Sequence, residues 1–323
     1  MGKKAREKRE RRSTARQGSA TVADLVGDKV SGYATAYVDL LGMGQQLLKM
    51  DSVVRSNDDE KRQQYVADTL LPIAYFRHHF KLFFEKFYSR EAAMPPGPLN
   101  AQSRAIWQSY TAGNPPLVTV FSDCVAISVP LDYDNRMTMF RSIYALLMAI
   151  AGTSAQLAFA KGVFVRGGIA LGYGCVMRDG GRDAEVLGSG IAKAYLLERR
   201  ADSPRVLLSA ELLGLLRGIP DGLAHDPTFP VDQALRDQCL GQLRTDEGQA
   251  FIDFLANPEV AEVLGGPAKL LDGVASHAHR NKAAALAGEY DEVKAEHIAK
   301  KYDWVLQYIE DVRARVCGSS ASP

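Results

Sequence analysis

The sequence predicts an α+β fold, in which a mixed or antiparallel sheet with flanking helices is followed by a helical C-terminal extension. Short segments rich in Val, Ile and aromatic residues, which are typical of strands, alternate with longer segments of helical periodicity. From about residue 225 onward only the helical pattern continues. We therefore expect one sheet, built from the first two thirds of the chain.

Four segments are expected to be strands, and four to be helices. The strands are 34–41, 117–129, 162–174 and 205–209, and the second of them allows a hairpin that turns at SDC. The helices are 59–88, which is amphipathic and interrupted by Pro72, and then 136–160, 188–201 and 283–316. The last is long and rich in charge, so it could pack on the core or carry a dimer contact. The Pro-rich and Gly-rich stretch 90–103 is expected to be a loop.

Composition excludes several classes of protein. With 323 residues, 46% of them hydrophobic, the chain is long enough for a large packed domain and is not disordered throughout. Its net charge of +1 argues against general binding to nucleic acid. Residues 1–20 differ, because they hold eight Lys or Arg against two Glu. We expect a disordered and functionally silent tail, with contact to nucleic acid or an anionic membrane as the alternative.

The cysteines and the most apolar helix both favour a cytoplasmic protein. The uncharged run 142–160 approaches transmembrane length but contains Gly, Thr, Ser and Gln, so we interpret it as a buried helix and expect no membrane insertion. The cysteines at 124, 175, 239 and 317 show no CxxC spacing and no disulfide pattern, which suits a reducing compartment.

Two acidic residues interrupt apolar strands and form the first candidate site. Asp39 lies in YVDLLGMG and Asp123 lies in FSDCVAIS. A buried, ionised carboxylate costs several kcal/mol unless a partner neutralises it. If the two strands are neighbours, one divalent cation, Mg²⁺ or Mn²⁺, could neutralise both acids. The alternative is that Asp39 is only a helix N-cap and Asp123 only a turn residue.

Phosphate binding is the second expected property of the same region. LLGMGQQLLKM is typical of a strand that runs into a helix, whose first amides bind phosphate, and glycines at 42 and 44 let the main chain approach a ligand closely. A third motif, VFVRGGIALGYG, places Arg166 before a glycine pair, although glycines in a strand often mark only close packing.

Taken in order, YVDLLG, FSDCVAIS, RGGIALG and EVLGSGIAKAYLLE resemble the catalytic domain of class III nucleotide cyclases. The chain is most similar to the pyrimidine cyclases of bacterial anti-phage defence, the Pycsar enzymes. The resemblance spans 33–210. It implies a class III cyclase-like (ferredoxin-like) sheet with a helical insertion at about 50–116, followed by the helical extension 225–316.

The resemblance also implies the chemistry. Asp39 and Asp123 would bind two Mn²⁺ or Mg²⁺ ions together with the backbone carbonyl of Leu40. The triphosphate would be held by Leu41, Gly42, Met43 and Gly44. One ion would lower the pKa of the ribose 3′-hydroxyl that attacks the α-phosphate, and the other would neutralise the departing pyrophosphate. The family forms its sites between two catalytic domains, so the resemblance implies a homodimer, and a separate effector that senses the cyclic nucleotide.

Base choice is expected to depend on Thr119 and Glu185, which match the two base-pocket positions of the family. A Thr and Glu pair matches the base-pocket residues of neither the adenylate cyclases nor the guanylate cyclases of the family. Glu185 can accept from uracil N3–H while the Thr119 hydroxyl donates to O4, so UTP, giving cyclic UMP, is favoured over CTP and then ATP.

Two departures from the family pattern concern the transition state. The family Asn falls on Ala192 and the family Arg falls on Leu196. Loss of one such donor typically costs about 2.7–4 kcal/mol. Five cations are candidates to replace it: Arg166, Lys193, Arg199, Lys300 and Lys301. A catalytically inactive cyclase-like module that binds a nucleotide and signals by conformation is the rival hypothesis.

Overall fold

The computed structural model describes residues 30–88, 101, 116–179, 183–218, 229–288 and 291–318. The predicted basic tail (1–20) lies outside these residues. The predicted loop 90–103 also lies outside them, except for residue 101.

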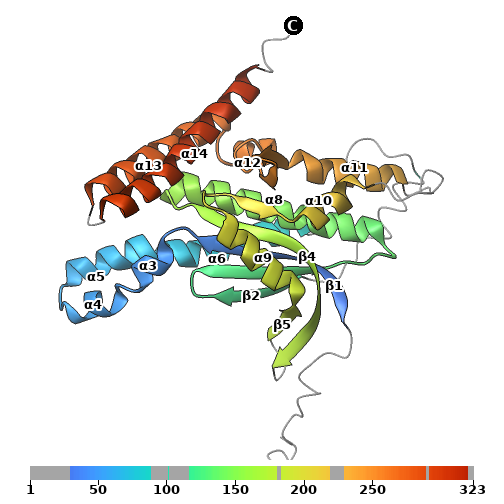
Figure 1. Cartoon of the computed structure of the whole chain (residues 1–323), viewed down its shortest axis with the longest axis horizontal. Helices are drawn as coiled ribbons and strands as arrows, with labels where there is room; N and C mark the ends of the chain where they lie inside the picture. Colours follow the sequence, from blue (N-terminus) through green and yellow to red (C-terminus); the bar gives the residue numbers. More distant parts are fainter. Residues whose placement is uncertain are drawn as a thin grey trace, which may run out of the picture.

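The strands of the described residues form one mixed sheet, in the order β2-β3-β1-β4-β6-β8-β7, with β5 paired to β4 (Figure 1). Among the strands of the described ranges, only β4 and β6 pair in parallel. The strands are β1 (Ser31–Leu40), β2 (Leu117–Phe121), β3 (Cys124–Pro130), β4 (Val165–Asp179), β5 (Asp183–Gly188), β6 (Val206–Leu208), β7 (Leu243–Asp246) and β8 (Gln249–Ile252). A mixed sheet with flanking helices is thus confirmed, as are the four predicted strands and the hairpin at SDC.

The prediction of helix alone after residue 225 is wrong. β7 and β8 form a hairpin whose turn has positive φ at Glu247 (49°) and Gly248 (77°), and β8 pairs with β6. Phe251 and Ile252 are buried in the core. Four-residue strands with charges at Arg244 and Asp246 escape a search for longer apolar segments.

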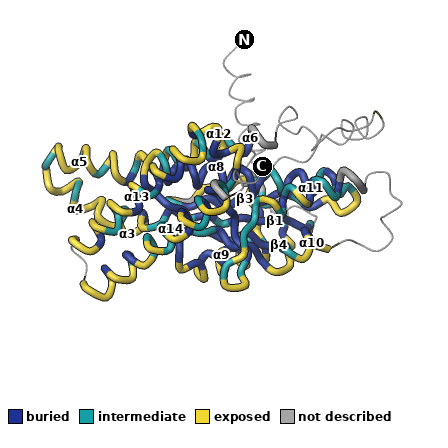
Figure 2. Tube along the Cα trace, turned by 90° about the horizontal axis from the view of Figure 1, so that it is seen from above, coloured by how far each residue is buried: buried dark blue, intermediate teal, exposed yellow. Residues whose placement is uncertain are grey.

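One face of the sheet packs on the long apolar helix. Along β1, Ala34, Ala36, Val38 and Leu40 are buried in the same core cluster as much of α8 (Arg136–Lys161), and α6 (Leu71–Tyr88) lies along α8. In Figure 2 the buried positions concentrate in the sheet and α8. Within the described residues α8 alone is long and apolar enough to cross a membrane, but 78% of its apolar window is buried inside the protein. This confirms the buried-helix prediction.

Glycines of β4 let α9 (Ser189–Arg200) pack on the opposite face. A Cβ added to Gly168 would lie 2.3 Å from the carbonyl oxygen of Ala194, and one added to Gly172 would lie 2.2 Å from the amide nitrogen of Gly190. The glycine-rich motif therefore serves the close approach of a helix to a strand.

The predicted interruption at Pro72 is present. α5 (Asp59–Tyr65) passes into a π-helical turn, η1 (Val66–Leu70), and α6 starts one residue before the proline. Proline removes an amide donor, and the wider π turn lies directly before it. α3 (Met43–Leu47) and α4 (Met50–Arg55) lead into this region, and α4 and α5 are mainly exposed (Figure 2).

The single helix predicted over 283–316 is wrong, because two helices occupy this region. α13 (Pro267–Ala287) ends before Gly288, and α14 (Glu292–Gly318) begins after Asp291, whose carboxylate accepts a bond of 2.9 Å from the backbone N–H of Lys294. This is an N-cap contact that starts a new helix. The two helices pack along each other (Figure 1). The described part of the chain also contains α10 (Ala210–Arg217), α11 (Phe229–Gly241) and α12 (Pro258–Val263).

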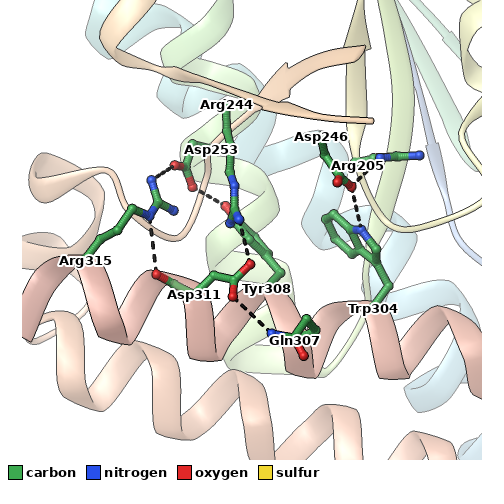
Figure 3. Close-up of polar contacts among 9 residues, drawn as sticks. All are labelled: Arg205, Arg244, Asp246, Asp253, Trp304, Gln307, Tyr308, Asp311 and Arg315. Carbon is green, nitrogen blue, oxygen red and sulfur yellow. Dashed lines mark hydrogen bonds and ion pairs between the residues drawn. The ribbon is translucent and has the colours of Figure 1, made fainter. Parts of the chain in front are cut away.

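A polar network holds α14 against β7 and against Asp253, the residue after β8 (Figure 3). The Tyr308 hydroxyl donates to Asp253 Oδ1 at 2.5 Å, and Arg315 Nη1 donates to Asp253 Oδ2 at 2.7 Å. One turn earlier, Trp304 Nε1 donates to Asp246 at 3.2 Å. These contacts fix the rotation of α14 about its own axis.

Candidate active site

Asp39 and Asp123 lie together at one end of two adjacent strands. In the register, Asp39 of β1 is opposite Cys124 of β3, the residue after Asp123. The N–H of Leu40 donates to the carbonyl of Asp123 at 3.3 Å. A Cβ on Gly44 would lie 3.5 Å from Asp123 Oδ2, so the first turn of α3, shortly after β1, faces the same acid. The condition that the two strands be neighbours is met.

Arg166 is the basic side chain in contact with Asp39. It lies opposite Asp39 on β4, and its Nη2 is 3.4 Å from Asp39 Oδ2. Its Nε is 2.5 Å from Oε1 of Glu198, a residue of α9 that is only 2% exposed. Sequence reasoning did not single out Glu198, although it closes the AYLLE motif. The β1–β4 register and the close packing of α9 were needed to place it.

Two carboxylates, Asp39 and Glu198, pair with this arginine, and the charge of Asp123 acts on Asp39 as well. Burial, then the charge of Asp123, raises the pKa of Asp39 to about 7, while Arg166 acts in the opposite direction and Glu198 adds to the increase. Burial also raises the pKa of Glu198. The site therefore carries more negative charge than its arginine balances.

This donor set fits a hard divalent cation. Mg²⁺ is usually held by one or two carboxylates together with water and substrate phosphate oxygens, and two carboxylates on adjacent strands match that pattern. The described residues contain no group of three or more His, Cys, Asp or Glu side chains that could hold a metal. Further ligands would have to be backbone, water or substrate oxygens, and the Leu40 carbonyl stays a prediction.

The loop after β1 is only partly available to a phosphate. Gly42 is exposed in the left-handed region (φ 85°), with nothing within 4 Å of an added Cβ. Gly44 is also exposed. The N–H of Leu41, in contrast, donates to the carbonyl of Phe164 at 2.8 Å, so this predicted phosphate donor is already used. The Met43 side chain is buried.

The structure separates the five candidate cations. Arg166 contacts Asp39, and Lys301 of α14 lines a cavity together with Leu41, Gly42 and Met43. Lys193 instead donates to the carbonyl of Leu171 at 3.3 Å and lies 3.5 Å from Glu211, where it lines a different cavity. Arg199 and Lys300 are exposed. Ala192 and Leu196, which replace the polar residues of the family pattern, are exposed on α9.

The two expected base-pocket residues lie on different parts of the sheet. Thr119 pairs with Ala126, which pairs with Tyr37, so Thr119 shares a face with Asp39 two strands away. Glu185 is exposed on β5 opposite Met177, eleven positions along β4 from Arg166. That is roughly 35 Å of strand length. Within one chain, Glu185 and Asp39 are therefore far apart along β4.

No protein-family model matches the sequence. No curated protein matches it. Among solved structures, the chain is similar to two structures of a bacterial light-regulated adenylyl cyclase. One has 11% identity and a TM-score of 0.35, the other 12% identity and a TM-score of 0.33, and in both the match covers 73% of this chain and 68% of the other.

Proposed function

We propose that the protein is a nucleotide cyclase that converts UTP to 3′,5′-cyclic UMP and pyrophosphate. One observation carries the proposal: Asp39 and Asp123 converge at the ends of adjacent strands, beside a glycine-containing loop, in a site with excess negative charge. The order of the four motifs that resemble class III cyclases supports the same function.

The residues take separate roles in this proposal. Asp39 and Asp123 would hold two Mg²⁺ or Mn²⁺ ions, which when bound would activate the 3′-hydroxyl and neutralise the leaving pyrophosphate. Gly42 and Gly44 leave the main chain open to the triphosphate. Arg166 holds Asp39 in place through its second partner, the buried Glu198.

Uracil is selected, in this proposal, by Thr119 and by Glu185 of a second copy of the chain. The separation of Glu185 from Asp39 along β4 supports a shared, homodimeric site, since the arm formed by β4 and β5 extends away from the chain's own acids. The product would act in the cytoplasm as a second messenger for a separate effector in antiviral defence, as the resemblance to Pycsar enzymes implies.

The test is direct. The purified protein is incubated with each of the four nucleoside triphosphates and Mn²⁺, and products are identified by mass spectrometry. We expect cyclic UMP in greatest yield, with CTP second and ATP third. Preferential turnover of ATP would overturn the base assignment but not the reaction class. No cyclic product from any of the four would overturn the proposed function.

A second candidate function is a catalytically inactive, nucleotide-binding signalling module. It is favoured by Ala192 and Leu196, because both are apolar and exposed where the family pattern has polar residues. In that case nucleoside triphosphates would bind, and binding would depend on Asp39, but no pyrophosphate would be released.

A further inference from the structure

The hairpin of α13 and α14 closes a cavity of about 430 Å³ beside the candidate active site. Its wall includes Leu41, Gly42 and Met43, the first residue of α3, which directly follow β1 and its Asp39. The other side is formed by the end of α8 and by the two C-terminal helices. The side chains with polar groups that line it are Gln46, Asp68, Lys161, Asn281, Lys301 and Tyr302.

Two ammonium groups are the main charges of this cavity. Lys301 is half-buried; burial, and then the charge of Arg166, lowers its pKa, while Asp202 acts in the opposite direction. Lys161 is the last residue of α8, and its Nζ lies 5.4 Å from the ring centre of Tyr75. Within the described part of the chain, neither lysine forms an ion pair with a carboxylate.

The remaining polar groups leave the cavity with a positive balance. Asp68 is the one acid in the lining, and it accepts a bond of 2.6 Å from Gln64. Asn281 is occupied, because its Nδ2 donates to the carbonyl of Gly162 at 2.8 Å. Among the described lining residues the two lysines therefore outnumber the acid, although the charge of Asp202, outside the lining, also acts on Lys301. The main chain at Gly42 is open on the same wall.

We propose that this cavity binds the polyphosphate part of a nucleoside triphosphate, with Lys301 and Lys161 of the same chain as the cations that contact it. The proposal rests on the proposed function for the identity of the substrate, but the anion site itself does not. An ammonium group binds phosphate as a compact point charge, most strongly when it is partly desolvated. A volume of about 430 Å³ is within the usual range for small-ligand sites.

The position of Lys301 is fixed by its neighbours on α14. The ring of Tyr302 packs against Phe164 at 5.8 Å between centres, and Trp304 donates to Asp246. Phe164 is also the residue whose carbonyl accepts from Leu41. The same segment before β4 thus contacts both the loop and α14, so the loop and Lys301 are held in one arrangement.

The test is calorimetric binding of inorganic tripolyphosphate and of pyrophosphate to the full chain, without divalent cations. We expect the wild type to bind, and Lys301→Met and Lys161→Met each to weaken binding about tenfold or more, because each removes a charged partner. Lys301→Arg should retain most of the affinity. Asp68→Asn should increase it. Lys300→Met, which changes an exposed neighbour, is the matched control.

Equal affinities for wild type, Lys301→Met and Lys300→Met would overturn the proposal, as would a wild type that binds neither anion. The basic tail is present in every variant, so it cannot create a difference between them. Circular dichroism of each variant separates a lost site from a lost fold. If cyclase activity is absent but tripolyphosphate binding still depends on Lys301, then only the proposed function has failed.

Discussion

Among the residues that the structure describes, Asp39 has one basic contact and two acidic neighbours. Arg166 pairs with Asp39 and Glu198 at once, while Asp123 adds charge from the adjacent strand. Burial is the largest cause of the raised pKa of Asp39, and the charges of Asp123 and Glu198 add to it. A cation would lower it by supplying the missing positive charge.

The pH dependence of stability follows from this raised pKa. The folded value of about 7 exceeds the ordinary 3.8, so the contribution of Asp39 is fully present below about pH 4 and is lost as pH rises through 7. Asp39→Asn has no carboxyl group to ionise, so its stability does not fall over this pH range. We expect its unfolding free energy to exceed that of the metal-free wild type by an amount that grows between pH 4 and 7, by on the order of 1.4 kcal/mol per pH unit.

Urea unfolding with a chelator at several pH values measures this difference. Asp134→Asn, an exposed turn residue, should show no such trend. A difference between Asp39→Asn and wild type that does not change with pH would contradict the electrostatic description of the site.

At the residue scale, the sequence singled out the two acids and Arg166, but not Glu198 or Lys161. Asp39 and Asp123 stand out because a buried, ionised carboxylate in an apolar strand is unfavourable without a neutralising partner. Glu198 and Lys161 do not stand out, because charged residues near helix ends are ordinary. Only the strand register and the docking of α9 and of the α13–α14 hairpin give these two side chains a role.

The packing of α9 on β4 is the main contact between elements near the site. Gly168→Ala would place a methyl group 2.3 Å from the Ala194 carbonyl oxygen, which is backbone and cannot move aside cheaply. We expect a destabilisation of roughly 1–3 kcal/mol, as for other overpacked sites. Gly214→Ala is the matched control, because nothing lies within 4 Å of its added Cβ, and it should stabilise α10 by about 0.5–1 kcal/mol.

Urea unfolding of both variants tests this account. If Gly168→Ala were no less stable than Gly214→Ala, close packing would not explain the glycines of RGGIALG.

At the element scale, long periodic segments were predictable and short ones were not. The four strands, the buried helix and the break near Pro72 follow from local pattern. β7 and β8 follow from the need of β6 for a second neighbour, a requirement that only the assembled sheet reveals. The division between α13 and α14 depends on Gly288 and Asp291, which interrupt an otherwise continuous helical pattern.

The C-terminal helices are part of the same core as the sheet, through long-range contacts such as Tyr308 with Asp253 (Figure 3). The Tyr308 hydroxyl also accepts from the N–H of Leu255 at 3.2 Å. Tyr308→Phe leaves this buried N–H without its partner, so we expect a loss of about 1–3 kcal/mol in unfolding free energy. Tyr173→Phe, at a tyrosine that is 67% exposed, should change little. Equal urea midpoints for the two variants would contradict this role of the network.

The proposed site requires two copies of the chain, because Glu185 lies far along β4 from Asp39. Specific activity should therefore fall on dilution through the dimer dissociation constant. Sedimentation velocity and activity are measured over the same concentration range. A fully active monomer would contradict the shared site.

The central claim is that Asp39 and Asp123 form one cation-dependent catalytic site. The measurement that tests it most directly is the initial rate of cyclic nucleotide formation with Mn²⁺ for wild type, Asp39→Asn, Asp123→Asn and the control Asp134→Asn, each with its fold verified by circular dichroism. We expect both site variants to lose roughly 10²–10³-fold or more, a loss typical of removing a transition-state stabiliser, and the control to match wild type. Turnover at the wild-type rate by either folded site variant would contradict the claim.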